Sequence, residues 1–221
     1  MNVRIELAYK TTKGTETSFS SEEMRAAKAI LIAEDLLRTG RAKNITFIDT
    51  HDNTWTMKDL KKFMEGIQTE PHHITVYFDG GFDIATRASG LGCVIYYEQN
   101  GKFWRLRKNA LVEELDTNNE VEYAALYLAL QELEGLGVHH LPVTIIGDSQ
   151  VVVNQLNGEW PVFEEQLNTW ADRIENMLQR LGITPSYKQV SRKNNREADQ
   201  LASQALKKVS IMSTIELPHE A

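Results

Sequence analysis

The chain has 221 residues, of which 42% are hydrophobic and 25% charged, a composition typical of a soluble globular protein with one large domain or one ordinary and one small domain. Its net charge of −7 argues against a passive nucleic-acid binder. It also lacks a run of about 18 apolar residues, which argues against a membrane span. A single cysteine, Cys93, excludes an internal disulfide, and an N-terminus without the apolar middle of a signal peptide favours a cytoplasmic protein.

Residues 1–70 predict a small α+β domain with balanced charge. They contain 11 basic and 11 acidic side chains, so the whole net charge of −7 falls on residues 71–221. A capping box formed by Ser20 and Glu23 is expected before the first helix, and the polar segment 68–73 is expected to be the domain linker. The residue patterns place strands at 3–9 and 44–49 and helices at 24–39 and 57–66.

Residues 71–210 predict a second, α/β domain, which a tail follows at 211–221. The elements come in the order β-β-β-α-β-α-α-β-α, which describes a mixed five-stranded sheet with helices on both faces. The strands are expected at 74–81, 89–98, 102–111, 143–148 and 185–191, and the helices at 118–135, 149–158, 164–182 and 196–209.

The first helix of this domain opens with the polar stretch TNNEVEY, residues 117–123, ahead of an apolar run. Helical geometry places Glu120 and Glu122 about 200° apart, so they cannot share a face. Glu120 lies three residues after Thr117, completes a capping box and heads a mostly polar side of the helix. Glu122 heads the apolar side, where a carboxylate is costly unless it is paired or binds a metal. Glu122 is therefore the candidate functional residue, and an edge residue that reaches solvent is the alternative.

Three aspartates occupy comparable positions in other elements. Asp79 is expected to end the first strand of the second domain, Asp148 ends the strand before a helix, and Asp199 lies in the first turn of the last helix. Each of them alone also fits a turn or a helix start. Because open α/β sheets place their sites at strand ends, the three aspartates and Glu122 are expected to converge. Four carboxylates repel one another unless a cation lies among them, and their hard oxygens favour Mg²⁺ or Mn²⁺.

Four segments of the second domain resemble, in order and spacing, the signature blocks of the type 1 ribonuclease H family. They read VYFDGG, TNNEVEYAAL, GDSQVVVNQLNGEW and VSRKNNREADQLA, and they cover about residues 72–209. The pattern R-x-x-N-x-x-A-D before the last helix is similar to the bacterial, archaeal and plant branch called reverse transcriptase-like. The resemblance implies an RNase H-like fold and hydrolysis of the RNA strand of RNA–DNA hybrids, by a two-metal-ion mechanism that leaves 5′-phosphate and 3′-hydroxyl ends.

The resemblance also implies roles for individual residues. The family's four catalytic, metal-binding acids match Asp79, Glu122, Asp148 and Asp199, which implies two bound Mg²⁺ ions, with Mn²⁺ as a substitute. It further implies that Asp79 bridges the two ions and that Glu122 senses the ribose 2′-hydroxyl. The substrate-binding residues that it implies are Gly80, Asn118, Asn119, Gln150 and Arg192.

The sequence departs from the family pattern before the last aspartate. Many members carry a histidine there that is thought to help the product leave, whereas residues 191–198 contain none and offer Arg192 for phosphate contact or product release. The segment 158–166 is acidic and forms no lysine-rich handle, which predicts weak substrate affinity. His72 and His73, in the expected linker, have no further ligands at metal spacing in the sequence, so no metal is expected there.

Two alternatives to a hybrid-specific ribonuclease remain open from the sequence. The first is an RNase H-fold module that binds nucleic acid or a protein partner with little or no turnover, which the acidic surface and the missing histidine favour. The second is a nuclease of the same fold that acts on another duplex. The expected partner is an RNA–DNA hybrid and not a membrane. Residues 1–70 are open to forming a homo-oligomer, docking a protein partner or bracing the sheet.

Overall fold

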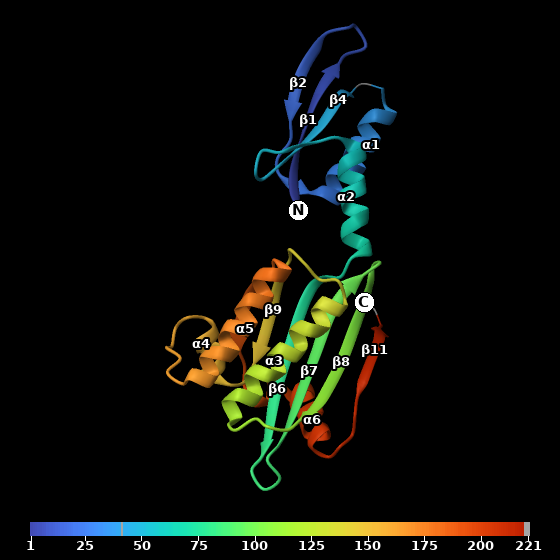
Figure 1. The fold of residues 1–221 in the computed structure, drawn as a ribbon. Helices are drawn as coiled ribbons and strands as arrows, with labels where there is room; N and C mark the ends of the chain where they lie inside the picture. Colours follow the sequence, from blue (N-terminus) through green and yellow to red (C-terminus); the bar gives the residue numbers. More distant parts are fainter. Residues whose placement is uncertain (41, 219–221) are drawn as a thin grey trace. The chain divides into compact units, whose positions relative to one another are not determined.

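The computed structural model describes residues 1–40 and 42–218, apart from the side chains of residues 67 and 68. The chain divides into two compact units, Met1–Thr69 and Glu70–Ala221 (Figure 1). The segment between their elements is shorter than the linker expected at 68–73, because helix α2 continues to Thr69 and strand β6 begins at His72.

The first unit is an antiparallel sheet with two helices. Strand β1 (Asn2–Lys10) pairs with β2 (Glu16–Ser20), β3 (Met24–Arg25) and β4 (Ala42–Asp49), and β4 also pairs with β5 (Thr54–Trp55). The helices are α1 (Ala26–Arg38) and α2 (Met57–Thr69). Apolar side chains from β1, α1, β4 and α2 form its core: Val3, Ile5, Ala26, Ala29, Ala33, Phe47 and Leu60.

The first helix begins later than the sequence predicts. Ser20 is the last residue of β2 and lies opposite Glu6 of β1, so it cannot cap the helix, which starts at Ala26. Strand pairing prevails over the capping box because Phe19 of β2 packs its ring against Tyr9 of β1, with 5.8 Å between the ring centroids.

A mixed sheet forms the centre of the second unit. In the described part of the chain it has six strands in the order β10-β9-β6-β7-β8-β11, with β9 parallel to both β6 and β10 and the other pairs antiparallel. The strands are β6 (His72–Asp83), β7 (Ala88–Gln99), β8 (Lys102–Val112), β9 (Pro142–Gly147), β10 (Thr184–Gln189) and β11 (Met212–Leu217).

Four α-helices complete the described part of this unit. They are α3 (Asn118–Gly135), α4 (Gln150–Leu156), α5 (Glu165–Leu181) and α6 (Arg196–Leu206), and a short 3-10 helix, Arg192–Asn194, precedes α6. None of the helices in residues 1–40 and 42–218 combines the length and the apolar character that crossing a membrane requires.

Helices α3 and α6 cover opposite faces of the sheet. A side chain on Gly80 of β6 would meet α3 at Val121, whereas one on Gly81 would meet α6 at Leu206. Because neighbouring residues in a strand point to opposite faces, the two helices lie on different sides. The core lies mainly where α3 packs between the sheet and α5, around Val121, Leu126 and Leu133. The predicted mixed α/β fold with helices on both faces is confirmed.

A strand occupies most of the segment for which the sequence predicts a C-terminal tail. Met212–Leu217 pairs antiparallel with β8, from Lys108 to Phe103, and adds one strand to the five that were predicted. Half of its six residues are polar and four are exposed, so periodicity alone gave no sign of a buried strand. The strand covers the backbone of β8, which would otherwise be an open sheet edge. Residues 219–221 of the predicted tail lie outside the described residues.

Candidate active site

Asp79 lies inside β6, not at its end as the sequence predicts. The strand continues to Asp83 because its antiparallel pairing with β7 extends to Ala88. The parallel pairing of β6 with β9, in contrast, stops at Tyr77. Asp79 therefore stands just beyond the point where the two parallel strands part, which is the edge at which open α/β sheets place their sites.

Glu122 and Asp148 approach Asp79 from two other elements. Asp148 directly follows β9, and Glu122 lies near the start of α3, which packs against β6. One carboxylate oxygen from each of the three residues lies within 4.8 Å of those of the other two. The structure thus brings together three of the four acids that the sequence singles out, from three separate elements.

The close approach of β6 to α3 depends on Gly80. A Cβ atom at this position would lie 2.6 Å from the carbonyl carbon of Val121 and 2.7 Å from the backbone nitrogen of Glu122, which is too close for any side chain. The backbone N–H of Gly80 donates a hydrogen bond to the Glu122 carboxylate. Gly80 therefore supports the site by letting the strand and the helix touch.

Burial and mutual repulsion hold protons on two of these carboxyl groups at neutral pH. Asp79 is 6% exposed, and burial followed by the nearby charge of Asp148 raises the pKa of Asp79 to about 8. Burial, followed by the charges of Asp79 and Asp148, raises the pKa of Glu122 to about 9. Both shifts have the sign expected for acids crowded into a poorly hydrated place, and a cation among them would oppose both.

One oxygen of Glu122 has no partner. Its Oε2 atom is buried and makes no hydrogen bond within the described part of the chain. An unpaired buried oxygen destabilises a fold, and an ionised one does so more strongly. A divalent cation would satisfy this oxygen together with those of Asp79 and Asp148. Carboxylate oxygens are the donors that Mg²⁺ and Mn²⁺ prefer, so the donor set fits such an ion.

Glu120 serves the start of the helix, as its spacing predicts. Its backbone N–H donates to Oγ1 of Thr117 at 3.2 Å, and its Oε2 accepts a hydrogen bond from the backbone N–H of Asp116 at 2.9 Å. The mostly polar side predicted for this residue holds at Gln131 and Glu134, which are exposed, but not in the first turn, where Glu120 and Tyr123 are buried. The carboxylate turns back toward the chain before the helix, which explains how Glu120 is buried outside the acid cluster.

Asn195 is a site residue that the sequence reasoning missed. Its Nδ2 donates to the carbonyl oxygen of Phe78 at 2.8 Å and to Oδ1 of Asp148 at 2.9 Å, and the residue is only 1% exposed. Asn195 therefore fixes Asp148 relative to β6. The available signal was the asparagine of the R-x-x-N-x-x-A-D pattern, which stands in a run of polar residues.

Asp199 lies beside the cluster but is paired with Arg192. Nε and Nη2 of Arg192 donate to Oδ1 of Asp199 at 2.9 and 2.5 Å. Asp199 does not belong to the group of described acids whose oxygens converge within 4.8 Å. The Arg192 charge also partly offsets the increase in the pKa of Asp79 and of Glu122.

The acids line a cavity of about 430 Å³ that includes some of the predicted substrate-binding residues. Gly80, Asn118 and Arg192 contribute to its wall together with Asp199. Asn119 and Gln150 do not belong to its lining among the described residues, and Gln150 is exposed at the start of α4. The cavity therefore collects three of the five residues expected to contact substrate.

Comparisons of sequence relate the chain to known proteins. Residues 77–205 match the family model described as reverse transcriptase-like. The chain is 46% identical over 193 residues to the uncharacterized protein YpeP of Bacillus subtilis, in a match that covers 87% of this chain and 85% of that protein. It is 36% identical over 90 residues to ribonuclease HI of Halobacterium salinarum, covering 41% of this chain and 44% of that relative.

Solved structures share the fold of the second unit. The RNase H1 of the halophilic archaeon Halobacterium salinarum NRC-1 superposes with a TM-score of 0.54 at 28% identity, over 61% of this chain and 98% of that one. LC11-RNase H1, solved in complex with an RNA/DNA hybrid, superposes with a TM-score of 0.53 at 28% identity, over 61% of this chain and 97% of that one.

Proposed function

Because the chain belongs to the reverse transcriptase-like family of ribonuclease H-fold proteins, we propose that it is a metal-dependent endoribonuclease that cleaves the RNA strand of RNA–DNA hybrids. The observation that carries the proposal is the convergence of Asp79, Glu122 and Asp148 with the unpartnered Oε2 of Glu122. Three crowded acids weaken a fold on their own, so a purely structural role explains them poorly. The structural neighbour that was solved with an RNA/DNA hybrid supports the choice of substrate.

Four acids would hold two Mg²⁺ or Mn²⁺ ions in this proposal. Asp79, Glu122 and Asp148, whose oxygens already converge, would hold the ions, and Asp79 would serve both of them. Asp199 would join these residues after giving up its pair with Arg192. When bound, the ions would activate the attacking water and stabilise the leaving 3′ oxygen, which leaves 5′-phosphate and 3′-hydroxyl ends.

The protein's own residues position the carboxylates and manage their protons. Asn195 holds Asp148 in place through its hydrogen bond to Oδ1. Asp79 and Glu122 must each lose a proton before they bind a cation, because their pKa values are raised to about 8 and about 9. Arg192, exposed at the wall of the same cavity, would contact a substrate phosphate.

Recognition of the hybrid would involve residues inside and outside the cavity. Gly80 and Asn118 line it and would contact the RNA strand close to the scissile phosphate. Asn119 and Gln150 lie outside its lining and would contact nucleotides further along. Glu122 would accept a hydrogen bond from the ribose 2′-hydroxyl, the group that distinguishes RNA from DNA.

The ion pair between Arg192 and Asp199 favours a second candidate function. An arginine that keeps Asp199 out of the cluster is expected in a module that binds nucleic acid with little turnover. A cleavage assay separates the two functions. A labelled RNA–DNA hybrid, an RNA duplex and a DNA duplex are each incubated with the full chain and Mg²⁺ or Mn²⁺. The variants are Asp148→Asn and, as a matched control on an acid outside the cluster, Glu120→Gln.

The proposed enzyme predicts cleavage of the hybrid alone, which chelator and Asp148→Asn abolish and Glu120→Gln preserves. We expect the Asp148→Asn rate to fall by at least about a hundredfold, because the substitution removes a metal ligand. Binding of the hybrid without cleavage at any metal concentration would instead support the binding module. Cleavage of the RNA duplex at the same rate would reject hybrid specificity.

A further inference from the structure

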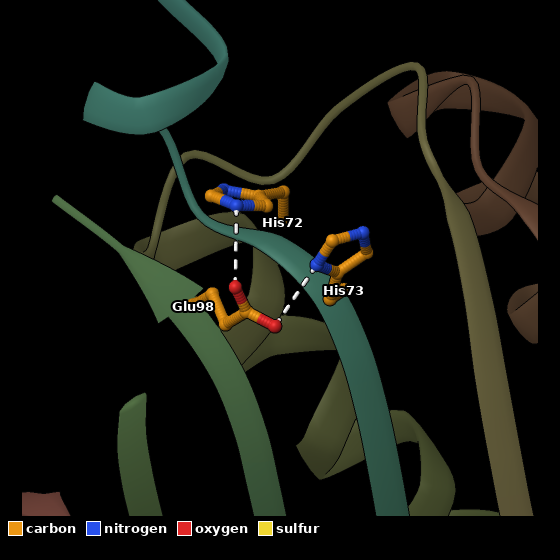
Figure 2. A group of neighbouring side chains, drawn as sticks. All are labelled: His72, His73 and Glu98. Carbon is orange, nitrogen blue, oxygen red and sulfur yellow. Dashed lines mark hydrogen bonds and ion pairs between the residues drawn. The ribbon is translucent and has the colours of Figure 1, made fainter. Parts of the chain in front are cut away.

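Two adjacent histidines and a glutamate meet at the start of the second unit (Figure 2). His72 and His73 open β6, and Glu98, near the end of β7, lies opposite His72 in the strand register. Nε2 of His72 is 3.7 Å from Oε2 of Glu98, and Nδ1 of His73 is 2.9 Å from Oε1. One atom from each of the three side chains lies within 4.8 Å of the others. The cluster shares no residue with the acid cavity.

The backbone bends to bring both histidines to one carboxylate. In a regular strand, adjacent side chains point to opposite faces of the sheet. His73 instead has a φ of 53°, in the left-handed region that few residues other than glycine adopt, and the β6–β7 register shifts between His72 and Thr75. Bulges of this kind redirect side chains and are frequent beside functional sites. Figure 2 shows both rings beside the carboxylate of Glu98.

His72 has the hydrogen-bond arrangement of a metal ligand. Its Nδ1 lies 2.9 Å from the carbonyl oxygen of Glu70, and since a carbonyl only accepts hydrogen bonds, Nδ1 carries the proton. In a neutral ring Nε2 then presents a lone pair, which faces the Glu98 carboxylate. Histidines that bind metals commonly donate their other N–H to a carbonyl or a carboxylate, because this bond fixes the tautomer and the ring orientation.

We propose that His72, His73 and Glu98 form a Zn²⁺-binding site with water as the fourth ligand. In a tetrahedral zinc site with bonds of about 2.0–2.1 Å, ligand atoms lie roughly 3.3 Å apart. His72 Nε2 and His73 Nδ1 lie 3.7 and 2.9 Å from the two different oxygens of Glu98, and one ligand atom from each side chain lies within 4.8 Å of the other two, so the three groups are near this spacing. The site selects zinc because imidazole nitrogen suits it, whereas the all-oxygen acid cavity suits Mg²⁺.

A metal-free ion pair explains the cluster less well. A hydrogen bond or ion pair accounts for His73, whose Nδ1 lies 2.9 Å from Oε1 of Glu98, but not for His72, whose Nε2 is 3.7 Å from Oε2 and beyond hydrogen-bond distance. One Zn²⁺ ion, in contrast, binds both rings and the carboxylate together. The His73 side chain is 73% exposed, so solvent has access to the fourth position.

Titration of the full chain with Zn²⁺ tests the proposal. Isothermal calorimetry is performed with excess Mg²⁺ present, so that the acid cavity is not the site measured. His73→Asn is the main variant, because asparagine tolerates a positive φ and keeps the backbone in place. Glu98→Gln keeps the shape of the side chain but removes its charge. The matched control is His139→Ala, since His139 and His140 are also adjacent, with ring centroids 5.4 Å apart, but belong to no metal-sized group among the described residues.

We expect one Zn²⁺ ion per chain with micromolar affinity, a higher melting temperature of the second unit on zinc binding, and unchanged far-UV circular dichroism. Affinity falls at least about tenfold in His73→Asn and in Glu98→Gln and is unchanged in His139→Ala, because only the first two variants lose a ligand. Zinc binding that survives both ligand variants would overturn the assignment. So would the absence of zinc binding in the wild-type protein when circular dichroism shows that it is folded.

Discussion

Replacing Glu122 by glutamine tests whether the acid cluster is suited to a cation. In chelator at pH 7, we expect Glu122→Gln to stabilise the second unit, although the substitution removes a buried native side chain. The pKa of Glu122 is raised to about 9, so the folded state holds a proton that the unfolded chain releases at this pH. Glutamine takes up no proton and avoids that cost.

The magnitude follows from the interval between the two pKa values. An unfolded glutamate titrates near pH 4.3. Between that pH and pH 7 the free energy of unfolding falls by about 1.4 kcal/mol per pH unit over roughly 2.7 units, or about 4 kcal/mol in total. The new amide brings a buried NH₂ group whose desolvation costs about 1–3 kcal/mol. The expected net gain is about 1–3 kcal/mol, which raises Tm by roughly 2–10 °C for a unit of this size. The gain disappears at about pH 4.5, because unfolded glutamate is there roughly half protonated and the cost of protonating the folded carboxylate falls below the cost of burying the amide.

Thermal unfolding followed by circular dichroism, at both pH values and with chelator or Mn²⁺, measures the effect. Mn²⁺ stabilises the wild-type protein and has little effect on Glu122→Gln, because the variant lacks a charged ligand. Glu120→Gln is the matched control: its carboxylate lies on the same helix and accepts a hydrogen bond from Asp116, which an amide oxygen also accepts. We expect that control to change stability by less than about 1 kcal/mol. Destabilisation of Glu122→Gln in chelator at pH 7 would refute this account of the cluster.

Three further predictions follow from the contacts of the site. At limiting Mg²⁺, we expect the rate of hybrid cleavage to rise from about pH 6 to about pH 9 and more Mg²⁺ to move the midpoint to lower pH, because Asp79 and Glu122 have pKa values near 8 and 9 and must lose protons to bind the ion. A rate that does not change with pH would contradict this. Asn195→Ala lowers the free energy of unfolding in urea by about 2–4 kcal/mol and slows cleavage at least about tenfold, because Asp148 and the carbonyl group of Phe78 lose their hydrogen-bond donor. The control Asn194→Ala, at an exposed neighbour, changes neither the stability nor the rate. Gly80→Ala lowers the free energy of unfolding by more than about 2 kcal/mol in the same urea assay, because the new Cβ meets the backbone of α3, whereas Gly135→Ala, with open space around it, has no measurable effect. Equal effects of the two substitutions would contradict the close approach of β6 and α3.

Sequence alone predicted most of the acid cluster because its members lie in regular elements or directly after one. Asp148 follows an apolar strand, and Glu122 heads the apolar side of a helix, so strand and helix periodicity give both positions. The close approach of Glu122 to Asp79 depends on the contact between Gly80 and α3, which hydrophobic periodicity does not predict. The pairing of Asp199 with Arg192 could not be predicted from the sequence either, because an arginine in a loop can pair with many acids until the fold places one beside it.

Asn195 and Glu120 show why side-chain environment is harder to predict than position. Asn194 and Asn195 are identical neighbours in a polar run, yet the first is exposed and the second is 1% exposed between β6 and Asp148. Glu120 heads a side of α3 that reads as polar, yet the fold covers this turn and the carboxylate bonds to the backbone before the helix. In both cases tertiary contacts override local pattern.

The pairing of His73 with Glu98 depends on strand register. The two residues are 25 positions apart, on strands β6 and β7, and a shift of one residue in register would turn a side chain to the other face. The bulge between His72 and Thr75 is such a local shift, and this segment contains no glycine that would have indicated a bulge in the sequence. The sequence therefore left the histidines without a third ligand, which the fold supplies.

Positive charge at the acid cluster comes from two sources within the protein itself. Protons on Asp79 and Glu122 neutralise two carboxylates, and the guanidinium group of Arg192 offsets a third, on Asp199. A divalent cation that binds here must displace these protons and compete with the arginine. Metal affinity at neutral pH is therefore lower than the number of carboxylates suggests, and it rises steeply with pH as the protons leave. In the proposed enzyme the same competition would link Asp199 to the reaction, because a substrate phosphate that draws Arg192 away would free this carboxylate to complete the cluster.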